Sequence, residues 1–201
     1  MRLFLLLSLS ILVSTSGLFA QNVKVQSVQS PGKMAKIYDG DWWLASALER
    51  RSGFLEGVAD CQTWVVRAEG FSGTSDQLVE KITRYYKTHP NDRRVLVIDI
   101  WRRVGAATST KPLPNGEVWK EPHWYLNGLW WRQVSESERL GFLEGYLWCL
   151  RTQVNRPENA YSRSLSFYVD EIDEYVRAYP KADDESVATI LERFRDGSKR
   201  Q

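Results

Sequence analysis

The stretch GDWWLASALERRSGFLEGVADC (Gly40–Cys61) has a counterpart in GLWWRQVSESERLGFLEGYLWC (Gly128–Cys149). A shift of 88 positions superposes the Trp-Trp pair, the five residues GFLEG and the closing cysteine. Further on, a shift of 90 aligns KITRYYKTHP (Lys81–Pro90) with EIDEYVRAYP (Glu171–Pro180). Because Gly, Trp, Cys and Pro recur over about 50 residues, the sequence predicts an internal duplication.

Each repeated unit is expected to contain helices. Ser135 with Glu138 forms a capping box, and Ser46 offers the same signal one place away in the first copy. These signals predict helices over roughly 47–67 and 136–153.

A second and a third helix are expected in each unit. Apolar residues at helical spacing follow the first helix, and Pro90 and Pro180 end the second. Asp92, and Asp183 or Asp184, are candidate caps for the third. The predicted fold is all-α, with two tandem three-helix units packed about a pseudo-twofold axis.

The N-terminal residues have the features of a secretory signal. Arg2 precedes an apolar run that is too short to span a bilayer, and small residues lead to Ala20. Cleavage after Ser16 and an uncleaved anchor are the alternatives. The expected organisation is a signal peptide at 1–20, a lead-in at 21–38, a first helical repeat at 39–103, a linker at 104–126 and a second helical repeat at 127–201.

Charge and composition exclude several function classes. The formal net charge of +2 provides no basic surface for nucleic acid or anionic lipid. After the signal, the sequence has no segment that predicts stable membrane insertion. The two histidines and two cysteines show no metal-ligand spacing, so neither a metal site nor a cofactor is predicted.

The repeated glycines are interpreted as helix-packing positions. Gly53 and Gly57 lie one turn apart on a predicted helix, as do Gly141 and Gly145. A glycine inside a helix costs about 1 kcal/mol relative to alanine, and close approach of another helix is the simplest compensation. A ligand that touches bare backbone is the alternative.

The two cysteines continue these glycine ridges by a further turn. If the two helices cross through their glycines, Cys61 and Cys149 face each other. A disulfide is the default expectation in a secreted protein. Buried free thiols and an intermolecular bridge are the alternatives.

Glu56 and Glu144 are the repeated acidic residues of GFLEG. Two carboxylates near a symmetry axis suggest glycoside chemistry, in which their separation sets the stereochemical outcome. The structural alternative pairs each glutamate with an arginine of its own helix.

Aromatic residues are the candidate partner-binding side chains. Neighbouring residues on a helix point about 100° apart, so both members of a Trp-Trp pair cannot enter one core. The second member either covers the seam between units or is exposed, and exposed Trp with Tyr is typical of a binding hot spot. The candidates are Trp42, Trp119, Trp124, Tyr125 and Trp130.

The order of motifs resembles a known family. GFLEGVAD (Gly53–Asp60), the helix that ends at His89-Pro90 and the run VLVIDIW (Val95–Trp101) are similar to the small secreted all-α Tai-type immunity proteins, which neutralise type VI amidase effectors. Ser52 and Leu140 stand where that family has a cysteine. The resemblance covers each unit separately and implies a helical fold and a secreted effector as a partner.

The leading functional hypothesis is therefore a secreted or periplasmic, non-enzymatic protein-binding module of the immunity-protein kind. A glycan-active or glycan-binding protein that uses Glu56, Glu144 and Trp platforms is the second hypothesis. A structural envelope protein is the third.

Overall fold

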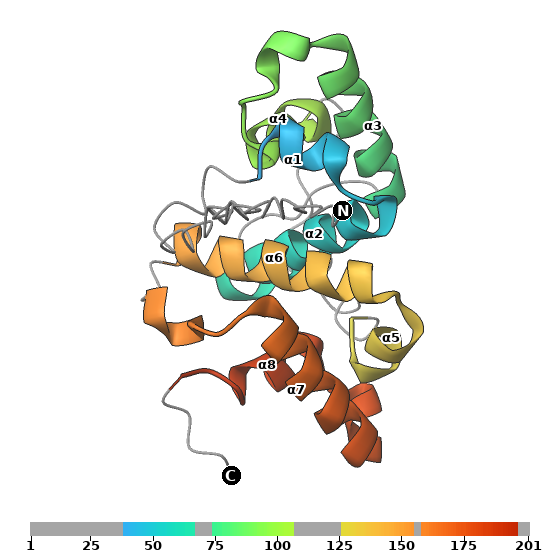
Figure 1. Ribbon diagram of the computed structural model, residues 1–201, viewed down its shortest axis with the longest axis vertical. Coiled ribbons are helices and arrows are strands. Elements are labelled where there is room, and N and C mark those ends of the chain that lie inside the picture. Colours follow the sequence, from blue (N-terminus) through green and yellow to red (C-terminus); the bar gives the residue numbers. More distant parts are fainter. Residues whose placement is uncertain (1–37, 67–73, 107–125, 155–157, 197–201) are drawn as a thin grey trace, which may run out of the picture.

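The computed structural model describes residues 38–66, 74–106, 126–154 and 158–196. In these ranges the chain forms eight α-helices and two isolated β-bridges. The expected all-α class is confirmed (Figure 1). The predicted signal peptide lies outside the described residues, as do Trp119, Trp124 and Tyr125.

Two central helices, α2 (Leu48–Cys61) and α6 (Glu136–Gln153), form the most extensive contact between elements (Figure 1). They run in the same direction, because Gly53 lies against the turn that begins at Glu138 and Gly57 against the following turn. The chain leaves α2 through a π-helical turn at Gln62–Val66.

Four glycines lie where these two helices meet. At each of them an added Cβ would overlap a backbone carbonyl oxygen of the opposite helix, so only glycine permits this approach. Each glycine Cα–H therefore faces a carbonyl, the arrangement of weak Cα–H···O bonds at helix interfaces. Gly53 faces Glu138, Gly57 faces Phe142, Gly141 faces Arg50 and Gly145 faces Phe54.

A disulfide joins the same two helices. The Cα atoms of Cys61 and Cys149 lie 6.1 Å apart, and both side chains are fully buried. The predicted intramolecular pairing is found, and neither cysteine is free. A bridge that closes a loop of this length stabilises the fold by about 4–5 kcal/mol in the chain-entropy account.

The remaining helices flank the central pair in two groups, one on each side of it (Figure 1). The first group belongs to residues 38–106, here called the first half, and the second to residues 126–196, the second half. The first half contains α1 (Gly40–Ala45), α3 (Ser75–Thr88) and α4 (Val97–Ala106). The second half contains α5 (Gly128–Gln133), α7 (Leu165–Ala178) and α8 (Val187–Glu192).

The same polar contacts occur within each half. In each half a polar residue caps the first short helix and forms a β-bridge to the residue just before the last helix. Asp39 caps α1 and pairs with Leu96, whereas Asn127 caps α5 and pairs with Ser186. Both halves therefore tie their first helix to their last in the same way.

The central helices begin close to the predicted residues, but the predicted capping signal is correct in one copy only. Ser135 caps α6 by accepting a hydrogen bond from the Glu138 amide, as its capping box predicts. Ser46 does not cap α2. It ends α1, where its hydroxyl donates to the Trp42 carbonyl, and Ala47 precedes α2 without a side-chain cap.

The proposed caps of the third helices are wrong for a local reason. Proline opens a short 3-10 helix in each half, at Pro90–Asp92 and Pro180–Asp184. The aspartates are used in or beside this turn, so α4 and α8 begin later, and Ser186 caps α8. Since α4 continues to Ala106, the connection between the halves starts after the predicted 104.

Candidate functional site

The two Trp-Trp pairs divide in the same way. Trp43 and Trp131 are fully buried, whereas Trp42 and Trp130 are half-buried. Each half-buried ring packs on the phenylalanine of its own GFLEG, with ring centroids 5.0 and 5.4 Å apart. Trp42 and Trp130 therefore contribute to packing beside the α2–α6 crossing.

Glu144 is clamped by an arginine from the other central helix. Its side chain is 7% exposed, and its two carboxylate oxygens accept hydrogen bonds of 2.8 and 2.6 Å from Arg50. Burial, and then the negative charge of Glu144, raise the pKa of the nearby Tyr38 hydroxyl. The expected pairing of Glu144 with an arginine of its own helix is corrected, because its partner lies on α2.

Glu56 occupies the matching place on α2 but has a different environment. Its Oε1 accepts a hydrogen bond of 3.2 Å from Ser75, and its Oε2 is buried without a hydrogen-bond partner. Burial raises the pKa of Glu56 to about 7, and repulsion from Glu138 and Asp76 adds to the rise. The expected pairing of Glu56 with Arg50 or Arg51 is not formed.

These environments decide what the repeated glutamates can do. A glycosidase needs two carboxylates that both face the substrate. Glu144 does not meet this condition, since Arg50 occupies both of its oxygens and the side chain is buried. The candidate catalytic pair Glu56 and Glu144 is therefore corrected to two packing residues, one ion-paired and one desolvated.

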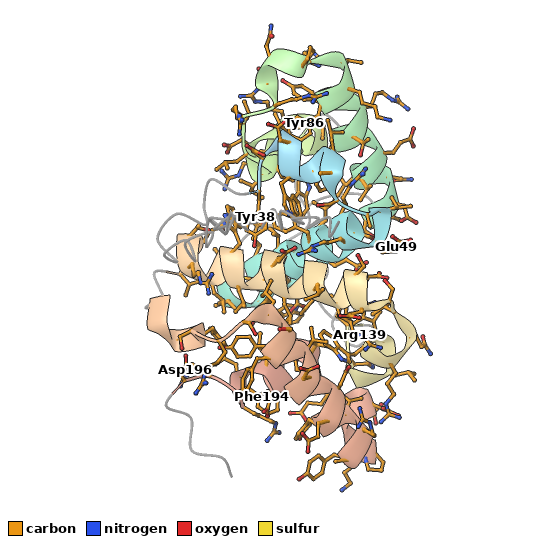
Figure 2. All side chains as sticks on the ribbon, in the orientation of Figure 1. Tyr38, Glu49, Tyr86, Arg139, Phe194 and Asp196 are labelled. Atoms are coloured by element: carbon orange, nitrogen blue, oxygen red, sulfur yellow. A yellow bond between two sulfur atoms is a disulfide. The ribbon has the colours of Figure 1, made fainter. Side chains whose placement is uncertain are left out.

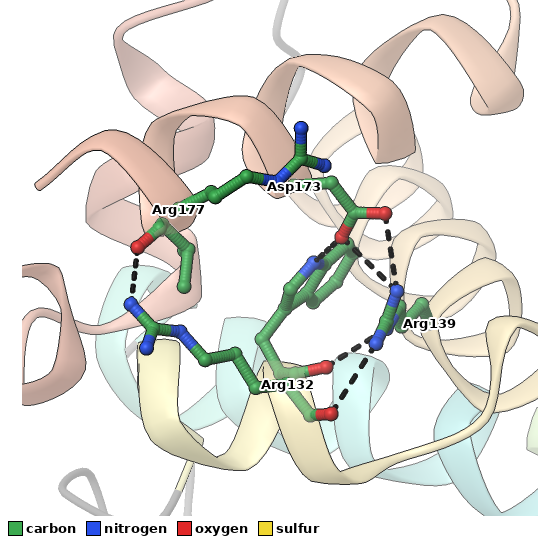
Figure 3. A pocket seen from close by; sticks show the side chains of 6 residues that line it. Arg132, Arg139, Asp173 and Arg177 are labelled. Carbon is green, nitrogen blue, oxygen red and sulfur yellow. Dashed lines mark hydrogen bonds and ion pairs between the residues drawn. The ribbon is translucent and has the colours of Figure 1, made fainter.

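A hollow of about 300 Å³ lies on the second half, where α5, the start of α6 and α7 meet (Figure 3). Three arginines dominate its lining. The lining residues are Trp131, Arg132, Arg139, Asp173, Val176 and Arg177.

Asp173 is the central acceptor of this hollow. Its carboxylate accepts bonds of 3.0 and 3.1 Å from Arg139 and one of 2.6 Å from the Trp131 indole. Arg139 also donates to the Trp131 carbonyl at 2.8 Å, and its guanidinium lies 5.6 Å from the indole centroid. Figure 2 shows Arg139 on the side of α6 toward α7, whereas Tyr38 lies on the side toward the first half.

The other two arginines differ in their contacts. Arg132 donates to the Val176 carbonyl and forms an ion pair with Asp183 at 3.1 Å. Arg177 is exposed, and its side chain has no ion pair or hydrogen bond within the described part of the chain. In Figure 3 its side chain lies across the top of the hollow, and its guanidinium end is at the rim near Asp173.

The first half has a related arrangement in which the acceptor is uncharged. Thr83 stands where the second half has Asp173 and accepts from the Trp43 indole at 2.9 Å and from Arg51 at 3.2 Å. Arg51 lies 5.8 Å from the Trp43 ring. Burial lowers the pKa of Arg51.

Sequence reasoning did not single out the arginines of the hollow. The spacing of eight residues from Trp43 to Arg51 and from Trp131 to Arg139 was the available signal, since it recurs in both halves. The residue that accepts from this tryptophan and arginine, Thr83 or Asp173, lies on another helix, so no local pattern marked it.

No family model matches the chain, and neither the curated proteins nor the solved structures contain a significant match to it. Within the described ranges, no helix has both the length and the apolar character that a bilayer crossing needs. Those ranges also bring together no group of three or more His, Cys, Asp or Glu side chains that could hold a metal ion.

Proposed function

We propose that this chain is a secreted, non-enzymatic protein-binding module built from two copies of one helical unit. The observation that carries the proposal is the α2–α6 crossing, which uses the repeated GFLEG residues for packing. The glycines admit the opposite backbone, the phenylalanines support the tryptophans, and Glu144 holds Arg50 across the interface. The signature shared by the two halves then serves architecture, and function belongs to the residues that differ.

The duplication is supported by contacts beyond the central helices. Tyr85 donates to Asp92 and Tyr175 to Glu185, near the outer ends of the two halves. Arg103 and Arg193, which a shift of 90 superposes, each contact one of these clusters. Since such contacts are not needed to form a helix, their recurrence favours descent of both halves from one unit, related by a pseudo-twofold axis.

The compartment is inferred from two features. Disulfides form and persist in secreted and periplasmic proteins, and the Cys61–Cys149 bridge is buried at the centre of the fold. The N-terminal sequence has the order of a signal peptide. Together they support a secreted or periplasmic protein.

A rigid scaffold suits protein binding. A crossing fixed by glycine contacts and a disulfide loses little conformational freedom when a partner binds, and this preorganisation strengthens association. The unrepeated segment between the halves contains Trp119, Trp124 and Tyr125, residue types that concentrate binding energy at interfaces. Because the motif order resembles that of Tai-type immunity proteins, a secreted effector toxin is the proposed partner.

The experiment is capture of a partner by residues 21–201, with the disulfide formed, from the culture medium and envelope fraction of the source cells. The captured protein is identified by mass spectrometry and its binding to the purified chain is measured by calorimetry. We expect a 1:1 complex that Trp124→Ala weakens by about tenfold or more, as for a hot-spot residue.

Leu48→Ala provides the control, because Leu48 is a large apolar side chain that is 58% exposed on the first half, away from the unrepeated segment in sequence. Equal loss of affinity in both variants would argue against the aromatic segment as the binding surface. Failure to recover any partner that binds the purified chain would remove the proposal.

A further inference from the structure

We propose that the hollow formed by α5, α6 and α7 binds a carboxylate, namely an Asp or Glu side chain presented by a protein partner. The inference rests on the proposed function and names the chemistry of the partner at one place on the surface. It depends on the arginines of the hollow and on the way their donors are divided.

The charges of the hollow do not balance within its lining. Asp173 is neutralised by Arg139, which binds both of its oxygens. Arg132 divides its donors between the Val176 carbonyl and Asp183, a residue that lies outside the lining. Arg177 keeps all of its donors available within the described residues, so the lining has an excess of positive charge at the rim.

The shape of the hollow favours a small acidic group. A volume of about 300 Å³ is at the lower end of the range for small-molecule sites, and suits a side chain better than a whole cofactor. A guanidinium presents its donors as a planar fork that matches the two oxygens of a carboxylate.

The supporting contacts fix the floor of the hollow. Arg139 is fixed by Asp173, by the Trp131 carbonyl and by the Trp131 ring, so the floor of the hollow is ordered before any partner arrives. The first half has Thr83 in place of Asp173, and a shift of 90 puts Lys87 in the place of Arg177. Lys87 lacks the fork, and this makes it a matched control.

The test follows the Trp131 indole N–H by ¹⁵N NMR, since this group donates to Asp173 beside the hollow. The probe is the peptide acetyl-Gly-Glu-Gly-Glu-Gly-amide, and the peptide with Gln in place of Glu is its neutral control. We expect a saturable shift with the Glu peptide alone, weakened at least about tenfold in Arg177→Gln because a hydrogen-bonded charge pair is lost. Lys87→Gln should leave the affinity unchanged.

Arg177→Lys separates charge from geometry and is expected to retain part of the affinity, because lysine keeps the charge without the fork. Absence of a saturable shift, or equal affinity for the Glu and Gln peptides, overturns the proposal. Equal binding of inorganic phosphate at matched ionic strength also overturns it, since that outcome describes a general anion site.

The two proposals fail separately. A captured partner that Arg177→Gln still binds with full affinity, together with no peptide binding, rejects the carboxylate site and leaves the protein-binding function standing. Saturable Glu-peptide binding without any recoverable partner rejects the protein-binding function and leaves only the carboxylate-binding chemistry of the hollow.

Discussion

Replacement of Glu56 by Gln is expected to stabilise the protein at alkaline pH and to change little at acidic pH. Burial is the main reason that the pKa of Glu56 rises from 4.5 to about 7, with the charges of Glu138 and Asp76 adding to it. Glutamine has nearly the same shape, keeps an oxygen for the Ser75 hydrogen bond and remains neutral at every pH.

The sign and size follow from proton linkage. Below pH 4.5 the carboxyl is protonated in the folded and unfolded states, so its pKa shift costs nothing. As pH rises from 4.5 to 7 the unfolded state ionises first, and the free energy of unfolding falls. Above pH 7 this loss of unfolding free energy is complete. At 1.36 kcal/mol per pKa unit it amounts to about 3 kcal/mol. This is an upper value, because the Glu56 side chain is not fully buried.

The assay is urea unfolding of the disulfide-intact chain, followed by tryptophan fluorescence at pH 4, 6 and 8. We expect Glu56→Gln to match the parent at pH 4 and to exceed it progressively at pH 6 and 8. Glu174→Gln, on the exposed face of α7, should give a small difference without this trend. A gain for Glu56→Gln that is equal at pH 4 and pH 8 would refute the assignment of a desolvated carboxyl.

Two further changes probe the central crossing. Gly145→Ala places a Cβ on the Phe54 carbonyl, so the helices must separate, and we expect the free energy of unfolding in urea to fall by about 3 kcal/mol or more. Ser137→Ala on the same helix is the control and should cost little. An equally mild effect at Gly145 would contradict close backbone contact. Joint replacement of Cys61 and Cys149 by Ala should lower the free energy of unfolding by about 4–5 kcal/mol. Intact-mass measurement of the parent should show two hydrogens fewer before reduction than after it, and an unchanged mass would contradict the bridge.

Several features of the fold followed from local sequence. Proline at 90 and 180 ends a helix wherever it occurs after helical spacing, because the preceding residue is excluded from the α region. The spacing of the glycines and of Cys61 and Cys149 along one ridge also predicted which faces of α2 and α6 meet. Such patterns depend on the period of the helix itself, which a sequence displays directly.

The candidate site was less accessible to the same reasoning. Ser46 carried a capping signal that the structure uses to end α1, because its hydroxyl donates to the Trp42 carbonyl of that helix. Trp42 and Trp43 have equal apolar character, and only the packing of α3 and α2 around them selects Trp43 for burial. The aromatic candidates Trp119, Trp124 and Tyr125 stay predictions, since they lie outside the described residues.

The sequence by itself predicted the helical class and the close contact through the glycines, since both are recorded in residue type and helical period, and it made pairing of the two cysteines the default expectation. Only the tertiary structure decided the partners of charged groups. Glu144 finds Arg50, 94 residues away, and Asp173 finds Arg139 on another helix. The environments of Glu56 and Glu144 differ although their sequence contexts match, because desolvation and Coulomb interactions depend on distance in space, which local spacing does not encode.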